Sequence, residues 1–253
     1  MIYPKKCVGC GECVSVCPLK LHSFESDNSH LVDRKKCISC GKCAAECSGA
    51  IEISGMEMSV DEVIEKVLRD TSFYENSGGG LTVSGGEPLM HPTFVLELFK
   101  KAKEKNIHTA IETSGYANPD IIESILPFTD LVLFDVKETN SELHKQYTGK
   151  DNSLILKNLK LLNQNGAKII LRCPIIPGYN DRDEHFESIA MLANELNSVE
   201  RIDIEPYHNL GKGKAKALGK DYPLSGLTLP TEDQIKQWIE KVSSFTDKAV
   251  IKS

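Results

Sequence analysis

Eight of the nine cysteines in this 253-residue chain fall within its first 47 residues, and their spacing restricts what that part of the chain can fold into. They form two runs of the pattern C-x2-C-x2-C-x3-C, and a lysine pair precedes each run. The first run is Cys7, Cys10, Cys13 and Cys17, and the second is Cys37, Cys40, Cys43 and Cys47.

Thiolates at this spacing are typical ligands of a [4Fe-4S] cluster, because three sulfurs on one tight loop reach three irons and the other run supplies the fourth ligand. We therefore expect two clusters. Cys47 would complete the set of Cys7, Cys10 and Cys13, and Cys17 would complete the set of Cys37, Cys40 and Cys43. Zinc or a disulfide framework is the alternative, although a four-sulfur zinc site does not account for two interlocking sets.

Composition excludes several classes of protein. The chain is 40% hydrophobic with a formal net charge of −6, which is ordinary for a globular protein with a sizeable core and unlike a nucleic-acid binder. Its longest apolar runs, such as 131–134, have the length of a strand, and its first residues lack the apolar core of a signal peptide. We expect neither a nucleic acid nor a membrane partner. Cluster-bound thiolates favour the cytoplasm and an anaerobic setting.

The residue pattern of the sequence changes near residue 57. Residues 1–56 form the cysteine-rich module, and residues 57–253 alternate strand-like with helix-like segments. The strand-like runs are 81–84, 109–112, 131–136, 169–173 and 202–205, and the helix-like runs are 94–105, 119–126, 152–163, 184–197 and 231–244. This alternation predicts an α/β fold with a parallel sheet, flat or closed into a barrel.

In such folds the chemistry sits where the strands end. The expected strands are followed or ended by Gly85-Gly86-Glu87, Glu112-Thr113, Asp135-Val-Lys137, Arg172 and a segment with His208. Each has a structural alternative, such as a plain turn at Gly85-Gly86 or a solvated pair of Asp135 and Lys137. Together they predict a polar pocket for a zwitterionic ligand.

These motifs, in this order, resemble those of the radical S-adenosylmethionine (SAM) superfamily. Within it, the chain is similar to the activating enzymes of glycyl radical enzymes, such as the pyruvate formate-lyase activating enzyme. The resemblance rests on Gly85-Gly86-Glu87-Pro88, Glu112-Thr-Ser-Gly115, Asp135-Val-Lys137, Ile176-Pro-Gly-Tyr-Asn-Asp181 and Pro206-Tyr-His-Asn-Leu-Gly211. A ferredoxin-like insert with two clusters also occurs in several members of this group.

The resemblance implies a role for each segment. Residues 85–87 would bind the SAM amino group, with Glu112 and Thr113 nearby. Glu112, Thr113 and Asp135 would also lie near a monovalent cation beside the SAM carboxylate. Lys137, Arg172 and His208 would line the rest of the SAM site or the docked glycyl loop of the partner. Asp135 and Lys137 are the candidates for catalytic residues.

The resemblance also implies a reaction and its partners. A reduced cluster donates an electron to SAM, and the resulting 5′-deoxyadenosyl radical removes a hydrogen atom from a backbone glycine of a glycyl radical enzyme. An electron donor such as flavodoxin or ferredoxin would supply the reducing equivalents.

The chain departs from the family in one respect. The SAM-ligating third [4Fe-4S] cluster needs C-x3-C-x2-C, and no cysteine run in the 253 residues has that pattern. The simplest account is a chain that begins late, giving a partial (β/α)6 barrel that lacks its first strand, exposes 81–84 as an edge and is inactive alone. The alternatives are a two-cluster electron-transfer protein with a vestigial SAM-binding barrel, or a radical SAM enzyme for another substrate. The sequence does not identify the partner enzyme.

Overall fold

The computed structural model describes residues 1–26 and 29–253 and separates into two compact units. The first unit contains residues 1–57 and 208–227, and the second contains 58–207 and 228–253. Residues 208–227 therefore pack with the cysteine-rich module, whereas the sequence pattern groups them with the sheet. One reason is the carbonyl of Ala217, which accepts hydrogen bonds from the Ile2 amide (2.8 Å) and the Arg34 guanidinium (2.9 Å).

The second unit confirms the predicted α/β class. Its sheet has six strands in sequential order, β3-β4-β5-β6-β7-β8, and every neighbouring pair is parallel. The strands are β3 (Gly80–Val83), β4 (His108–Thr113), β5 (Leu131–Asp135), β6 (Ile169–Ile175), β7 (Val199–Pro206) and β8 (Ala249–Lys252). Strand β3 forms one edge of this sheet, as expected for residues 81–84. Strand β8 was not predicted, because a four-residue run near the end of the sequence carries little periodicity.

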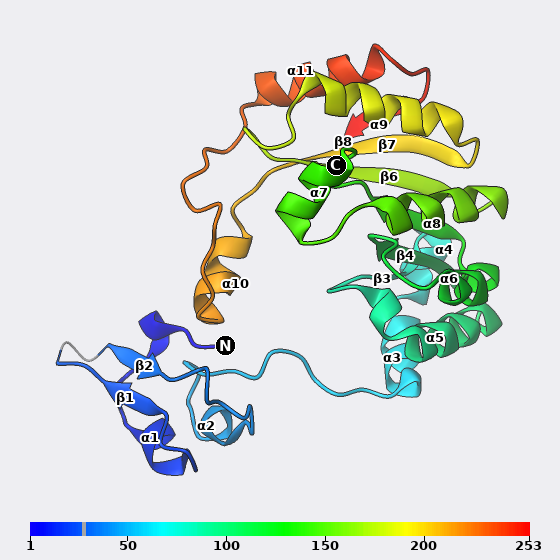
Figure 1. Ribbon diagram of the computed structural model, residues 1–253. Helices are drawn as coiled ribbons and strands as arrows, with labels where there is room; N and C mark the ends of the chain where they lie inside the picture. The colour runs from blue at the N-terminus through cyan, green and yellow to red at the C-terminus, as the bar shows by residue number, and fades with distance from the viewer. Residues whose placement is uncertain (27–28) are drawn as a thin grey trace. The chain divides into compact units, whose positions relative to one another are not determined.

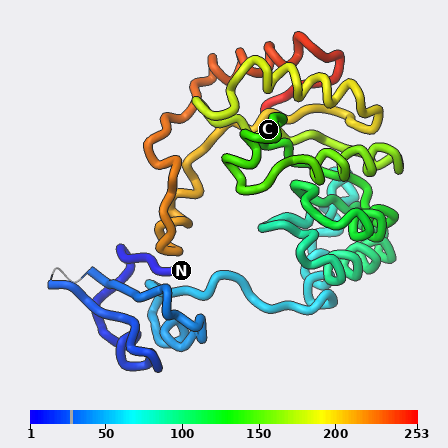
Figure 2. Tube along the Cα trace, in the orientation of Figure 1, coloured from blue at the N-terminus to red at the C-terminus, as the bar shows by residue number. Residues whose placement is uncertain are grey.

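The helices of the second unit are α3 (Val60–Leu68), α4 (Thr71–Ser77), η2 (Pro88–Met90), α5 (Pro92–Glu104), α6 (Pro119–Ile125), η3 (Leu126–Phe128), α7 (Ser141–Thr148), α8 (Ser153–Gln164), α9 (Asp183–Glu195) and α11 (Glu232–Ser243). Helices α5, α6, α8, α9 and α11 follow the outside of the curved sheet (Figure 1), and the Cα trace shows the same succession of strand and helix (Figure 2). Among the described helices, none has the length and apolar character needed to cross a membrane.

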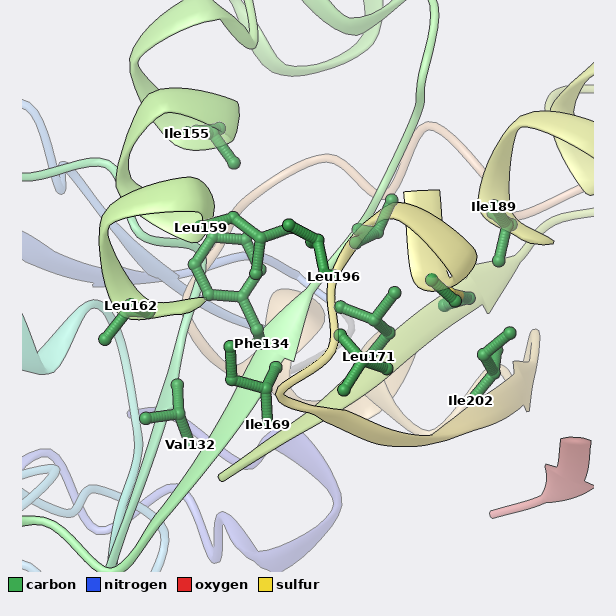
Figure 3. Close-up of a cluster of buried hydrophobic side chains, with 14 of the residues drawn as sticks. Val132, Phe134, Ile155, Leu159, Leu162, Ile169, Leu171, Ile189, Leu196 and Ile202 are labelled. Carbon is green, nitrogen blue, oxygen red and sulfur yellow. The ribbon is translucent and has the colours of Figure 1, made fainter. Parts of the chain in front are cut away.

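Apolar side chains of the sheet and the helices form one core between them. Figure 3 shows Phe134 of β5 beside Leu159 of α8, with Leu171 of β6 and Ile202 of β7 on the same side, and all four are fully buried. This core fixes the sheet and leaves the loops at the strand ends to carry polar groups. Cys173, in the middle of β6, is also fully buried.

Helix termini match the local sequence signals. Ser59 caps α3 through a capping box in which its hydroxyl accepts from the Glu62 amide and the Glu62 carboxylate accepts from the Ser59 amide. Thr231 and Gln234 make the same arrangement at α11, and Trp238 of α11 is buried in the core. These capping signals explain why α3 begins at Val60 and α11 at Glu232.

The first unit has little apolar core. It contains η1 (Pro4–Lys6), α1 (Glu12–Val16), β1 (His22–Phe24), β2 (His30–Val32), α2 (Lys42–Ala45) and α10 (Gly211–Ala217). Strands β1 and β2 form an antiparallel hairpin, and Ile2 forms a β-bridge with Ile51. Its buried apolar cluster has only Ile2, Cys13 and Ile51 at the centre, so the cysteine loops need another source of stability.

We predict that Gly115 tolerates alanine much less well than Gly166, although both have a φ near +70°. A Cβ on Gly115 would lie 2.5 Å from the Phe134 ring, whereas a Cβ on Gly166 meets no atom within 4 Å. Gly166→Ala should lower the free energy of unfolding by about 1 kcal/mol through backbone strain, and Gly115→Ala by a further ~1–3 kcal/mol through overpacking. Urea unfolding followed by fluorescence of Trp238, the sole tryptophan, measures both. Equal losses would contradict the prediction.

Candidate functional site

The structure brings the eight cysteine side chains of the module into two groups of four. One pocket is lined by Cys7, Cys10, Cys13 and Cys47. Another is lined by Cys17, Cys37, Cys40 and Cys43. In each group, three thiols come from one run and the fourth comes from the other run, which is the grouping that the spacing predicts.

The backbone prepares these thiols to act as ligands. Helices α1 and α2 each begin after a glycine in the left-handed region, Gly11 at φ 80° and Gly41 at φ 77°, so the two cysteine loops turn in the same way. The amide of Leu21 donates to Cys17 Sγ at 3.4 Å, and this hydrogen bond is the main reason that the pKa of Cys17 is lowered.

Burial and neighbouring thiols make two other cysteines, Cys13 and Cys43, harder to deprotonate. Burial raises the pKa of Cys13, and the neighbouring Cys7 and Cys10 raise it further. Burial also raises the pKa of Cys43, with Cys37 adding to the effect. Four thiolates at such a site repel one another until a cationic centre joins them, and this donor set fits an iron–sulfur cluster.

Two histidines adjoin the first group of thiols. His30 Nε2 lies 3.5 Å from Cys13 Sγ and 2.9 Å from Nδ1 of His22. The two imidazole rings are stacked, with their centroids 5.1 Å apart. The Phe24 ring also stacks on His30, with a distance of 4.9 Å between the ring centroids. The sequence pattern gave no role to either histidine.

At the strand ends of the second unit, Glu87 joins the loops after β3 and β4. Its carboxylate accepts from the Thr113 hydroxyl (2.6 Å) and from the Ser114 hydroxyl (2.7 Å) and amide (3.0 Å). The side chains of Glu87 and Thr113 are therefore hydrogen-bonded to groups of the protein itself. A Cβ at Gly85 or Gly86 would meet no atom within 4 Å, so the backbone of this loop is open to a ligand.

Arg172 lies between two carboxylates, those of Glu112 and Glu205. Its Nη1 is 2.5 Å from Glu112 Oε1, and its Nε and Nη2 donate to Glu205. Burial disfavours the charge on Arg172, but the Glu205 and Glu112 carboxylates outweigh it and raise the pKa of the guanidinium. Glu205 was not among the residues predicted for the site.

Asp135 and Lys137 form a second ion pair at 2.7 Å, between Asp135 Oδ2 and Lys137 Nζ. Asp135 is the register partner of Arg172 across β5 and β6, so the two ion pairs lie on neighbouring strands. Three carboxylates, Glu112, Asp135 and Glu205, face two cationic side chains here. The surplus negative charge suits a cationic ligand.

His208 is not brought to these residues by the second unit. It begins the segment that belongs to the first unit and is exposed, so its role stays a prediction.

Buried polar groups that the sequence pattern did not reveal form a network that holds the loops after β4, β5 and β6. The Asn180 side chain accepts from the Ile176 amide (2.7 Å) and donates to the carbonyls of Lys137 (2.8 Å) and Pro174 (2.7 Å). Asn158, fully buried on α8, donates to the carbonyls of Gly115 and Ala117, both at 2.8 Å. An asparagine on the apolar face of α8 is a signal that would have found Asn158.

The network also contains an acid–imidazole pair. Glu138 and His185 are both buried, and Arg182 donates to Glu138 at 2.8 Å. Thr139 places its hydroxyl 2.8 Å from His185 Nδ1. Burial lowers the pKa of His185 to about 4, with Arg182 acting in the same direction and Glu138 opposing it.

Comparison with known families agrees with both units. Residues 36–190 match the radical SAM superfamily, and residues 1–48 match the 4Fe-4S dicluster domain. The isethionate sulfite-lyase activating enzyme of Nitratidesulfovibrio vulgaris is 38% identical over 88% of this chain and 73% of its own length. The trans-4-hydroxy-L-proline dehydratase activating enzyme of Clostridioides difficile is 40% identical over 92% of this chain and 78% of its own length.

A solved structure gives the same result. A domain of the pyruvate-formate lyase-activating enzyme from Bacteroides vulgatus is 28% identical, with a TM-score of 0.57 over 68% of this chain and 98% of that chain. The chain belongs to the radical SAM superfamily and, within it, to the activating enzymes of glycyl radical enzymes.

We predict that the stability of the second unit falls as the pH decreases from about 6.5 to about 4. His185 is neutral in the folded protein, and its folded pKa of about 4 lies below the ordinary 6.5, so the unfolded chain binds the proton more readily. The stability that neutral His185 contributes is fully present above pH 6.5. About 2 kcal/mol of the free energy of unfolding is lost between pH 8 and pH 5. Urea unfolding monitored by Trp238 fluorescence at several pH values tests this.

His185→Gln is the control, because glutamine fills the site with a side chain that does not titrate. The variant should be less stable at pH 8 but should lose about 2 kcal/mol less than the wild type on acidification. The same pH dependence in both proteins would contradict the prediction.

Proposed function

We propose that this chain acts in the SAM-dependent activation of a glycyl radical enzyme, by hydrogen abstraction from a backbone glycine of that partner. The observation that carries the proposal is the similarity to activating enzymes over about nine tenths of the chain, joined to two thiol groups with cluster-ligand composition. When bound, a reduced [4Fe-4S] cluster supplies the electron that cleaves SAM to a 5′-deoxyadenosyl radical.

The strand-end residues have distinct parts in this proposal. The open backbone at Gly85 and Gly86 binds the SAM amino group, and Glu87 with Thr113 holds that loop in place from within. Glu112 and Asp135 provide the negative charge that attracts the ammonium group or a monovalent cation.

Arg172 and Lys137 can change partners when a ligand binds. Each is held by a carboxylate at a distance of 2.7 Å or less, so an incoming SAM carboxylate competes with Glu112 for Arg172 and with Asp135 for Lys137. This exchange positions the cofactor without leaving a charge unpaired. His208 remains our candidate for the partner's glycyl loop.

The two thiol groups serve electron delivery in this proposal. Cys7, Cys10, Cys13 and Cys47 hold one [4Fe-4S] cluster, and Cys17, Cys37, Cys40 and Cys43 hold the other. A flavodoxin or ferredoxin reduces them, and the cytoplasm provides the reducing setting that such thiolates require.

A two-cluster electron-transfer protein with a vestigial SAM-binding barrel is the second candidate. It is favoured by one observation, the absence of C-x3-C-x2-C from the 253 residues. Both candidates share the clusters and differ in whether SAM is cleaved.

We predict that the 253-residue polypeptide, loaded with iron and sulfide and reduced, forms no 5′-deoxyadenosine from SAM. A fusion in which a relative's segment containing C-x3-C-x2-C precedes Met1 should form it, and should generate a glycyl radical in the glycyl radical enzyme that this relative activates. Chromatography detects the nucleoside, and electron paramagnetic resonance (EPR) detects the radical.

The control is the same fusion with the three added cysteines changed to alanine. Product formation by the 253-residue polypeptide would refute its predicted inactivity. A silent fusion whose accessory clusters nevertheless load and reduce would refute the activation proposal in favour of electron transfer.

We predict about eight iron atoms per chain, and paired substitutions test how the cysteines are grouped. Cys7→Ala with Cys47→Ala removes two ligands of one cluster, so about four iron atoms should remain. Cys7→Ala with Cys17→Ala removes one ligand from each cluster, so both should be weakened and less than about four should remain. Iron analysis and the EPR intensity of the reduced protein measure the outcome. The opposite order would show that each run holds its own cluster.

A further inference from the structure

One side-chain contact distinguishes the two thiol groups, and their repeated sequence does not predict it. Cys13 and Cys43 occupy the same position in the two cysteine runs. Cys13 Sγ has the imidazole of His30 at 3.5 Å, whereas within residues 1–26 and 29–253 no imidazole is at hydrogen-bond distance from Cys43 Sγ. Among the described residues, this imidazole contact is therefore present at Cys13 and absent from the matching Cys43.

The direction of the hydrogen bond follows from the partners. A cluster-bound thiolate carries no proton, so it accepts, and the nitrogen that faces it must be the donor. His30 Nδ1 is buried and has no partner among the described residues. A proton on Nδ1 would leave a buried N–H without an acceptor, which is rare, while a proton on Nε2 leaves only a lone pair unmatched. The protonated nitrogen of neutral His30 is therefore Nε2.

His22 fixes the orientation of that N–H. Its Nδ1 lies 2.9 Å from His30 Nε2, and it is buried with 6% of its surface exposed. The one N–H of His30 is then shared between His22 Nδ1 and Cys13 Sγ. Phe24 stacks against His30 with an interplanar angle of 19°, so the imidazole is held by stacking as well as by hydrogen bonding.

We propose that His30 is a positioning residue that donates a hydrogen bond to Cys13 and raises the reduction potential of the first cluster. An N–H donor stabilises the reduced cluster, in which the sulfurs carry more negative charge. The inference rests on the proposed assignment of the two thiol groups to [4Fe-4S] clusters, which iron analysis tests separately. It implies that loss of the imidazole lowers the potential of the cluster of Cys7, Cys10, Cys13 and Cys47 and leaves the other potential in place.

His30→Phe tests the proposal in the cluster-loaded full chain, because phenylalanine keeps the stacking on Phe24 and removes the donor. EPR-monitored redox titration should show one midpoint moving to lower potential, by a change of about tenfold in the reduction equilibrium constant, which is ~59 mV for a one-electron couple. The other midpoint should stay in place. His22→Phe is the matched control, since it leaves the His30 N–H for sulfur alone, and its first-cluster midpoint should not fall.

A second measurement does not depend on any variant folding. In wild-type protein labelled with 15N-histidine, pulsed EPR of the reduced clusters should reveal a weak coupling to one histidine nitrogen that carries an exchangeable proton. Absence of that coupling in protein with about eight iron atoms overturns the proposal. Equal shifts in His30→Phe and His22→Phe, or shifts of both midpoints in His30→Phe, overturn it as well.

Discussion

Repulsion between sulfur atoms is the constraint on which the cysteine-rich unit depends. Each group gathers four thiols, and the pKa values of Cys13 and Cys43 are raised by burial and by their neighbours. The apolar cluster beneath them has only Ile2, Cys13 and Ile51 at its centre. A unit of this kind gains its stability from the bonds between thiolate and metal, because it buries too little apolar surface to offset the entropy of ordering its loops.

The second unit differs from the first in its source of stability. Its core is large and apolar, with Phe134, Leu171 and Ile202 fully buried, so the burial of apolar side chains stabilises the sheet. Stability of the sheet permits polar groups to gather at the strand ends, where Arg172 is held between Glu112 and Glu205. Buried asparagines then hold the loops themselves. Asn180 and Asn158 together donate hydrogen bonds to four carbonyl groups of the site loops, which an apolar side chain cannot do.

Local signals were sufficient to predict much of this. Capping at Ser59, the alternation of strand and helix, and the grouping of the eight thiols all follow from patterns within a short stretch of sequence. Contacts between distant segments were not predictable in this way. The ion pair of Arg172 with Glu112 joins residues 60 positions apart, and the side chain of Glu87 turns out to bind Thr113 and Ser114. A strand-end motif indicates that a residue is near the site, but only packing decides whether its side chain faces a ligand or supports a neighbouring loop.

Duplication of the cysteine run explains why the two thiol groups are alike, and the hairpin between the runs explains how they come to differ. Strands β1 and β2 are present once, so His22 and His30 can serve only the thiol group against which the hairpin packs. A hydrogen bond to one sulfur changes the energy of one reduced centre and leaves the other unaffected, so the hairpin adds a difference between the two centres that the repeat does not contain. Direction in electron transfer can therefore arise from an element outside the repeat, while the repeat itself supplies only the ligands.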